Sequence, residues 1–159
     1  MADTSLSVGG LDKKMADFGD GTHGDAVRVE AGTALIGKVG LENSLVAVAA
    51  TIADDASLSV EVDLGAGRIL CAIDMPADWT AANLTFQASY NTGGTFDNLY
   101  DQYGTEKTII AAEDRYIALD DPAFWMGVRY LKVRSGTSGT PVVQDRVGGT
   151  TVQLVTKPV

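Results

Sequence analysis

The residues that could perform acid–base chemistry are few in this chain, and their spacing does not favour catalysis. His23 is the single histidine among 159 residues, and glycines stand close to it on both sides. A hydrolase triad requires a histidine that a third group holds in place. A glycine-rich loop, which is what the surrounding composition predicts here, holds a side chain poorly. We therefore predict no catalytic residue and no enzyme activity.

Three groups of aspartates could offer oxygen ligands to a hard cation such as calcium. Their spacing does not match the twelve-residue calcium loop, which has acids at positions one, three and five and a glutamate at position twelve. We interpret them as solvated loop residues and as residues that form turns or helix caps, and we predict no metal site. The groups are Asp17, Asp20 and Asp25, then Asp54 and Asp55, then Asp120 and Asp121.

Cofactor chemistry finds equally little support in the sequence. Gly65-Ala66-Gly67-Arg68 lacks the further glycine and the following helix of a phosphate-binding loop, so we predict a turn there and no cofactor. The single cysteine, Cys71, lies in an apolar run and is interpreted as a small buried hydrophobic residue. One cysteine cannot form a disulfide within the chain, which fits folding in a reducing cytoplasm.

The net charge of −9 disfavours partners that are themselves anionic. Binding to nucleic acid depends on lysines and arginines that displace counterions from phosphates, and the 12 basic residues are scattered here. We predict no nucleic-acid partner. The sequence also contains no evident secretory signal and no apolar run of the ~20 residues that cross a bilayer, so we predict no membrane association.

The two tryptophans, Trp79 and Trp125, allow two interpretations. In a sheet protein they commonly fill the ends of the core. Exposed on the surface, they would form an aromatic platform on which sugars stack. Three tyrosines, Tyr90, Tyr100 and Tyr103, could extend such a platform. We favour the core and keep the platform as the alternative.

Short strands must position these residues, and the clearest pair of strands lies between residues 84 and 100. Apolar and polar residues alternate over 84–89, which is the period of a half-buried strand. Asn91-Thr92-Gly93-Gly94 then favours a tight reversal, since its residues tolerate positive φ. The chain returns over 95–100, with Phe96 and Leu99 as expected core anchors. We predict a β-hairpin.

The rest of the chain after residue 41 shows further strand patterns separated by turn residues. Within 57–64 the alternation places Leu58, Val60, Val62 and Leu64 on the inner face. Asp120, Asp121 and Pro122 predict a capped helical turn over 120–124. The remaining predicted strands span residues 45–52, 68–75, 106–111, 115–119, 128–134 and 150–156. This spacing, without long helices, indicates an all-β fold, an antiparallel β-sandwich of jelly-roll-like or immunoglobulin-like type.

Residues 1–40 differ from the sandwich domain of residues 41–159, because their apolar residues are separated by glycines and charges. A helical turn or two over 13–18 and short extended segments at 26–29 and 34–39 are the elements we expect there. This segment has too little contiguous apolar surface for a core of its own. We predict an extended N-terminal arm that docks on a neighbour, with contacts from Leu6, Val8, Leu11, Met15 and Phe18.

Four stretches resemble a small structural protein encoded by tailed bacteriophages and prophages. They are IDMPADWTAANLTFQAS (73–89), GTFDNLYD (94–101), VRYLKVRSGT (128–137) and VQLVT (152–156). The resemblance covers about residues 41–159 and the N-terminal arm much less. It implies a particle component, assembled in the bacterial cytoplasm and located in the virion, with no enzymatic residues to transfer.

Together the resemblance and the residues lead us to expect a capsid decoration (cement) protein on the phage head. Its partners would be the major capsid protein or other virion proteins. We expect a homo-oligomer, with a trimer as one option that no sequence pattern supports. The alternative function is a carbohydrate- or receptor-binding module of a head fibre or tail.

Overall fold

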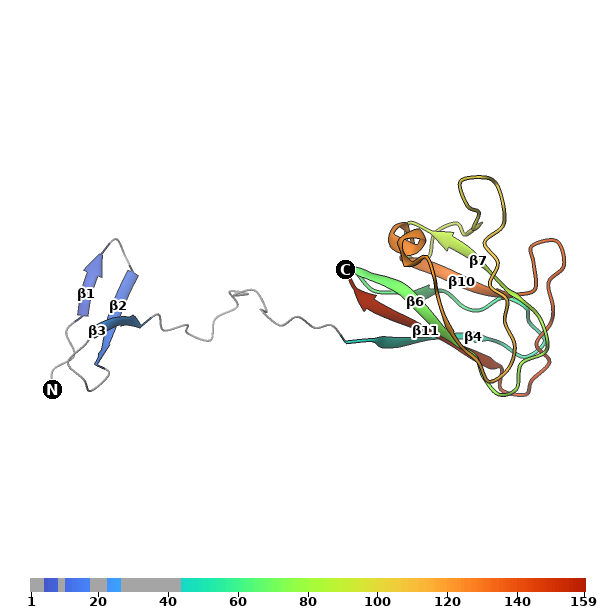
Figure 1. Ribbon diagram of the computed structural model, residues 1–159, viewed down its shortest axis with the longest axis horizontal. Coiled ribbons are helices and arrows are strands. Elements are labelled where there is room, and N and C mark those ends of the chain that lie inside the picture. Colours follow the sequence, from blue (N-terminus) through green and yellow to red (C-terminus); the bar gives the residue numbers. More distant parts are fainter. Residues whose placement is uncertain (1–4, 9–10, 18–22, 27–43) are drawn as a thin grey trace. The chain divides into compact units, whose positions relative to one another are not determined.

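The computed structural model describes residues 5–8, 11–17, 23–26 and 44–159 (Figure 1). The chain divides into two compact units, Met1–Gly40 and Leu41–Val159. In the first unit, β1 (Ser5–Val8), β2 (Leu11–Asp17) and β3 (His23–Ala26) form one antiparallel sheet in that order. Strand β2 occupies residues for which we predicted helical turns, and that prediction was wrong over 13–17. Because β2 pairs with a strand on each side, its ladders outweigh a weak local helix propensity.

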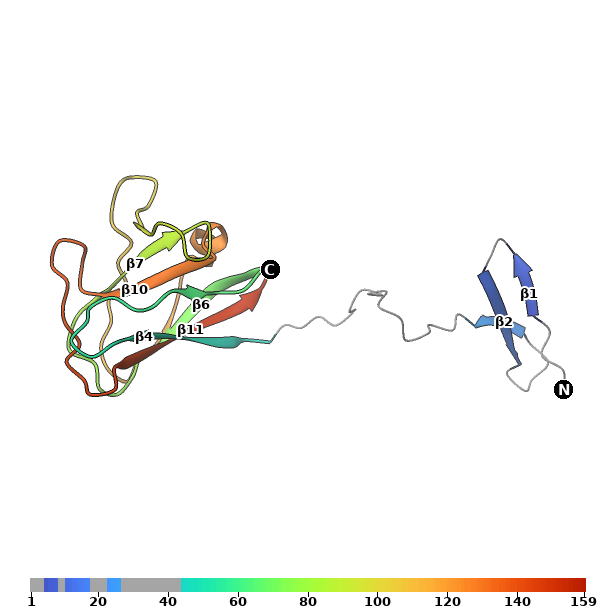
Figure 2. The ribbon, with the colours of Figure 1, turned by 180° about the vertical axis from the view of Figure 1, so that it is seen from behind.

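The second unit is built from two antiparallel sheets of four strands each, so the prediction of an all-β sandwich is confirmed (Figures 1 and 2). One sheet has the order β4-β11-β6-β9 and the other the order β5-β10-β7-β8. The first sheet contains β4 (Val46–Ile52), β6 (Arg68–Asp74), β9 (Tyr116–Ala118) and β11 (Thr150–Pro158). The second contains β5 (Val62–Asp63), β7 (Leu84–Ser89), β8 (Asp97–Asn98) and β10 (Tyr130–Ser135).

The core lies between the two sheets and takes residues from the inner face of each. Along β11, the buried Val152 and Leu154 alternate with partly exposed neighbours, as a strand with one core face requires. The facing sheet supplies Phe86, Leu131 and Val133, all fully buried. Cys71 is half-buried rather than buried as predicted, and its Sγ donates to the Val155 carbonyl at 3.3 Å.

The predicted hairpin is present as β7 and β8, which pair at Gln87 with Asn98 and at Ala88 with Asp97. Leu99 packs against the core as expected. Phe96 does not belong to the core cluster. Its ring instead lies 4.6 Å from the Lys132 ammonium on the adjoining part of the sheet, in a cation–π contact.

The predicted alternation over 57–64 fails in its first half. Val60 is 64% exposed and Ser59 is buried, which is the reverse of the expected pattern. Here the chain crosses from one sheet to the other, since Ser59 bridges to Ile52 and Leu58 bridges to Arg134. The Ser59 hydroxyl accepts from the Val133 amide and donates to the Val60 carbonyl, so the buried polar group is satisfied.

Two further predicted elements have different outcomes. The helical turn is confirmed as the 3₁₀ helix η1 (Pro122–Gly127), because the Asp121 carboxylate accepts from the Phe124 amide as an N-cap. Residues 106–111 do not form a named strand. They pair only through single bridges, Tyr100 with Glu106 and Leu84 with Ile109, which continue the edge of the second sheet beyond β7.

A largely buried ion pair connects this edge to the centre of the sheet. The Arg134 guanidinium donates to Glu106 Oε1 at 3.2 Å and to Asn98 Oδ1 at 2.6 Å. The Glu106 carboxylate also accepts from the Ser138 amide. One carboxylate therefore neutralises a buried cation on β10 and orders the loop that follows it.

We predict that Glu106→Ala lowers the free energy of unfolding by about 3 kcal/mol, because it leaves the Arg134 charge buried without its counterion. Urea denaturation monitored by tryptophan fluorescence measures the change. Glu113→Ala, at an exposed position, is the control and should change stability by less than about 0.5 kcal/mol. Equal effects of the two substitutions would contradict a structural role for the ion pair.

Candidate functional site

The two tryptophans lie in the core of the sandwich. Trp125 is 1% exposed, and its ring meets Phe86 edge-on at 4.9 Å and Phe124 edge-on at 5.3 Å. Trp79 is buried as well, and its indole N–H donates to the Ala82 carbonyl at 2.9 Å. The aromatic platform at Trp79 and Trp125 is therefore not available, since both rings are covered by the protein itself, and the core interpretation holds.

The residues first considered for catalysis and for calcium are partly in strands. His23 begins β3 and is the register partner of Asp17, and Asp25 is the partner of Met15. The interpretation of these residues as one continuous loop was wrong, because β2 and β3 pair through them. Asp20 lies outside the described residues.

Four of the five predicted docking residues lie on the two paired strands β1 and β2. Val8 is the register partner of Leu11, and Leu6 is the partner of Lys13. Antiparallel partners share a face, and so do residues two apart on a strand. Leu6, Val8, Leu11 and Met15 therefore fall on one face of the three-stranded sheet. The same pairings place Lys13, Asp17, His23 and Asp25 on that face with them. Phe18 lies outside the described residues.

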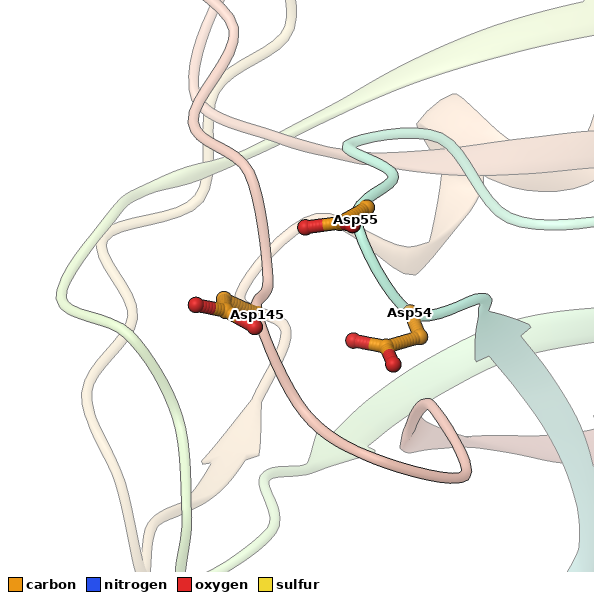
Figure 3. Close-up of side chains that lie close together, drawn as sticks. All are labelled: Asp54, Asp55 and Asp145. Atoms are coloured by element: carbon orange, nitrogen blue, oxygen red, sulfur yellow. The ribbon is translucent and has the colours of Figure 1, made fainter.

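Three exposed carboxylates, those of Asp54, Asp55 and Asp145, lie together at one end of the sandwich (Figure 3). One carboxylate oxygen from each of the three residues lies within 4.8 Å of the other two. Asp54 and Asp55 form the turn after β4, in which the Ala56 amide donates to the Ala53 carbonyl. Asp55 has φ of +58°, a left-handed conformation that aspartate tolerates better than most residues.

Gln144 is the residue that brings Asp145 to this turn. Its amide N–H donates to the Ala56 carbonyl at 2.8 Å. Its buried side chain donates to the Thr80 carbonyl and to Ser135 Oγ, and accepts from the Thr80 amide. The sequence interpretation did not join Asp145 to Asp54 and Asp55, because only this buried glutamine connects segments so distant along the chain.

What the three carboxylates can do follows from their exposure. Calcium takes six to eight oxygen ligands, and these side chains would supply a minority of them. Solvent covers the cluster, so mutual repulsion of the carboxylates costs on the order of 1 kcal/mol in water. We interpret the group as a turn that carries like charges.

We predict that Asp145→Asn raises the free energy of unfolding by about 0.5–1 kcal/mol at low salt, because it removes one of the repelling charges. The gain should vanish near 1 M salt, where the Debye length is about 3 Å. Thermal denaturation at the two ionic strengths measures it. Asp78→Asn is the control, since it makes the same change in net charge at another exposed site. A gain no larger than that of the control would contradict the repulsion.

A shallow hollow of about 330 Å³ lies between the turn after β5 and the end of η1. Arg129 lines it and forms a bidentate ion pair with Asp63, with both N···O distances at 3.0 Å. The hydrogen bonds from Arg129 lower the pKa of Asp63 below its ordinary value of 3.8. They also raise the pKa of Arg129. The second arginine of the hollow, Arg68, donates to Thr156 and to the Ser44 carbonyl. Both cations are thus engaged within the protein.

We predict that the ion pair stabilises the protein at neutral pH and that this contribution is lost in acid. Because the folded pKa of Asp63 is below its unfolded value, the contribution is complete above about pH 5 and declines as the pH falls through 3.8 and below. Asp63→Asn keeps the acceptor for the Gly65 amide while removing the charge. The stability difference between wild type and this variant, measured by urea denaturation from pH 2.5 to 7, should follow that course. Arg129→Met should strongly reduce the pH dependence of the difference, leaving only what the Gly65 amide contributes, and a pH dependence of unchanged size would contradict the assignment.

A second hollow, of about 340 Å³, lies between residues 107–110, β9 and η1. Its wall includes Lys107, Asp120 and Asp121 together with the aliphatic Ile109 and Ile117. Lys107 is held over the Phe124 ring at 4.3 Å, and Asp121 caps η1. Two of the polar groups of this hollow, those of Lys107 and Asp121, therefore have structural partners.

Among the described residues, no helix combines the length and the apolar character needed to cross a membrane. Comparison of the chain with models of known families, with curated proteins and with solved structures gives no match.

Proposed function

We propose that this protein is a structural component of a tailed-bacteriophage virion, and specifically a decoration (cement) protein that binds the major capsid protein on the head surface. The observation that carries the proposal is the N-terminal unit, Met1–Gly40, whose described strands form a single sheet. The protein would strengthen the shell through non-covalent contacts, by burying apolar area across the joints between capsid subunits.

The N-terminal sheet has strands of 4, 7 and 4 residues and one face with four apolar positions. A sheet with an apolar face is stable when another layer covers that face. A shell lattice supplies such a layer at every lattice point, and binding at many equivalent points adds strength to the whole shell. We assign the face of this sheet that carries Leu6, Val8, Leu11 and Met15 to the contact with the capsid.

The sandwich supports the proposal through the roles of its polar residues. Arg134 and Gln144, the two large polar side chains in its interior, both form hydrogen bonds that hold the fold together. The stretches that resemble the phage protein contain β7, β8 and β10 and overlap the end of β6 and the middle of β11. The net charge of −9 also suits a particle surface, because it keeps neighbouring particles apart.

Cryo-electron microscopy of intact particles from the source would test the location directly. Density for the sandwich at lattice points over the head supports decoration and identifies what the N-terminal sheet contacts. Density restricted to the tail or fibre tips favours the alternative, a carbohydrate- or receptor-binding module. Absence of the chain from the particles would refute both.

We predict that Val8→Asp in the full chain weakens attachment to particles at least tenfold, because it places a charge beside Leu6 and Leu11 on the face that we assign to the contact. Co-sedimentation of the purified protein with particles that lack it measures attachment. Ser7→Asp is the matched control, since Ser7 lies next in the same strand but on the other face. If both variants attach equally well, the face that carries Val8 does not form the contact.

One observation favours the alternative function, a carbohydrate- or receptor-binding module. Tyr90 is 90% exposed at the tip of the β7–β8 hairpin, and Tyr103 is exposed in the next turn. Tyrosine rings in such positions can stack on sugars. These residues, rather than the tryptophans, would carry any glycan contact.

A further inference from the structure

The four edge strands of the sandwich differ in length. Strands β5 and β8 have two residues each, and β9 has three. Strand β4, the remaining edge, has seven. Short edges offer few backbone groups to another chain, whereas a long edge is a template for pairing. Only β4 among the described edges of the sandwich has the length to accept a partner strand.

Strand β4 also lacks the residues that commonly keep edge strands apart. From Ser44 to Ala53 the sequence contains no charged residue and no proline, in a chain of net charge −9. The first two residues of the strand, Val46 and Ala47, are exposed, and so is Leu45 directly before it, at 59%. An uncharged apolar edge of this kind is open to a neighbouring strand.

The backbone groups on the free side of β4 can be identified from its hydrogen bonds. Successive residues of a strand direct their N–H and C=O groups to opposite sides. The Thr51 carbonyl accepts from the Val60 amide, which lies on the side away from β11. Residues two apart share a side, so Leu45, Ala47 and Ala49 direct their groups the same way. Within residues 44–159, no backbone hydrogen bond reaches these three from that side.

We propose that this free edge pairs antiparallel with the same edge of a second copy of the chain, about a two-fold axis at Ala47. Ala47 then faces Ala47 of the other copy, and each Leu45 faces an Ala49. A hydrogen-bonded antiparallel pair exchanges two bonds, so this register provides about six. The exposed Val46 is covered by Val48 of the other copy.

The choice of a second copy rests on charge and on register. Residues 41–159 contain 15 acids and 8 bases, a net charge of −7, so two copies repel each other over most orientations. The uncharged edge of β4 is a place where they can approach without opposing carboxylates. The register is limited at one end by Val60, which already bonds to Thr51, and a two-fold pair centred on Ala47 uses the three free positions.

The contact joins two short strand segments and buries less area than a standard interface of about 1,600 Å². We therefore expect a dissociation constant on the order of 10–100 μM, well above that of obligate dimers. The proposed dimer forms between isolated chains and does not depend on the virion role. Evidence against one of the two proposals therefore leaves the other unaffected.

Sedimentation equilibrium of the full chain, from micromolar concentrations to about 1 mM, tests the proposal. We expect a shift from 16.6 kDa toward twice that mass. A monomer at every concentration, or a trimer, would overturn the two-fold pairing.

Ala47→Pro should abolish the dimer, because it removes an N–H directed at the partner and leaves the bonds between β4 and β11 in place. Ala118→Pro is the matched control. Leu119 bonds to Cys71 on β6, so the neighbouring Ala118 directs its N–H outward from the opposite edge of the same sheet. The control should dimerise normally. A dimer that survives Ala47→Pro, or that is lost equally in the control, would refute the assignment.

Circular dichroism and urea denaturation establish that the variants are folded. If Ala47→Pro is unfolded, Ala47→Lys and Ala118→Lys form the second matched pair, since lysine remains compatible with an edge strand. Loss of the dimer in Ala47→Lys alone supports the proposal, and its retention overturns it. Hydrogen exchange gives an independent measure: the Ala47 and Ala49 amides should become protected as concentration rises, and unchanged exchange in a dimer would place the contact elsewhere.

Discussion

The position of β11 at the centre of its sheet is the constraint on which the sandwich depends. This nine-residue strand, nearest the end of the chain, hydrogen-bonds to β4 on one side and to β6 on the other. Its inward residues Val152 and Leu154 are fully buried. Arg68 on β6 reinforces the arrangement, because it donates to Thr156 and to the Ser44 carbonyl and so joins three neighbouring strands at one end of the sheet. With β11 absent, β4 and β6 would have no strand between them.

The sequence was sufficient to predict the elements whose signals are local. The hairpin at 84–100 and the cap of η1 depend on residues close together in the chain, and both are present. The exposed Val60, the cluster at Asp145 and the strand β2 depend instead on distant partners: the crossing between sheets, the anchor at Gln144, and pairing with β1 and β3. Alternation reports which residues could face inward, but the partner strands decide which ones do. Candidate site residues were the least predictable for the same reason.

The described polar interior is organised for stability. Glu106 neutralises the charge of the buried Arg134. The side-chain amide of Gln144 donates hydrogen bonds to the Thr80 carbonyl and to Ser135 Oγ. Buried polar groups of an enzyme site typically stand with perturbed pKa values in a cleft. The pKa shifts here belong to an exposed pair, Asp63 and Arg129, whose partners are each other. The role that we propose, binding to other proteins, uses the surface of the sandwich, and these polar groups support the fold beneath it.

The two surfaces proposed for binding share a physical basis. The N-terminal sheet offers four apolar residues on one face, and β4 offers backbone groups along an uncharged edge. Main-chain pairing is tolerant of sequence, so it gives little selectivity by itself. Selectivity must come from exclusion, and the acidic surface supplies it, since carboxylates elsewhere repel a second acidic copy. The negative charge that keeps copies of the protein apart therefore also restricts the surfaces through which they can make contact. For this reason the small uncharged edge of β4 can determine how two copies associate.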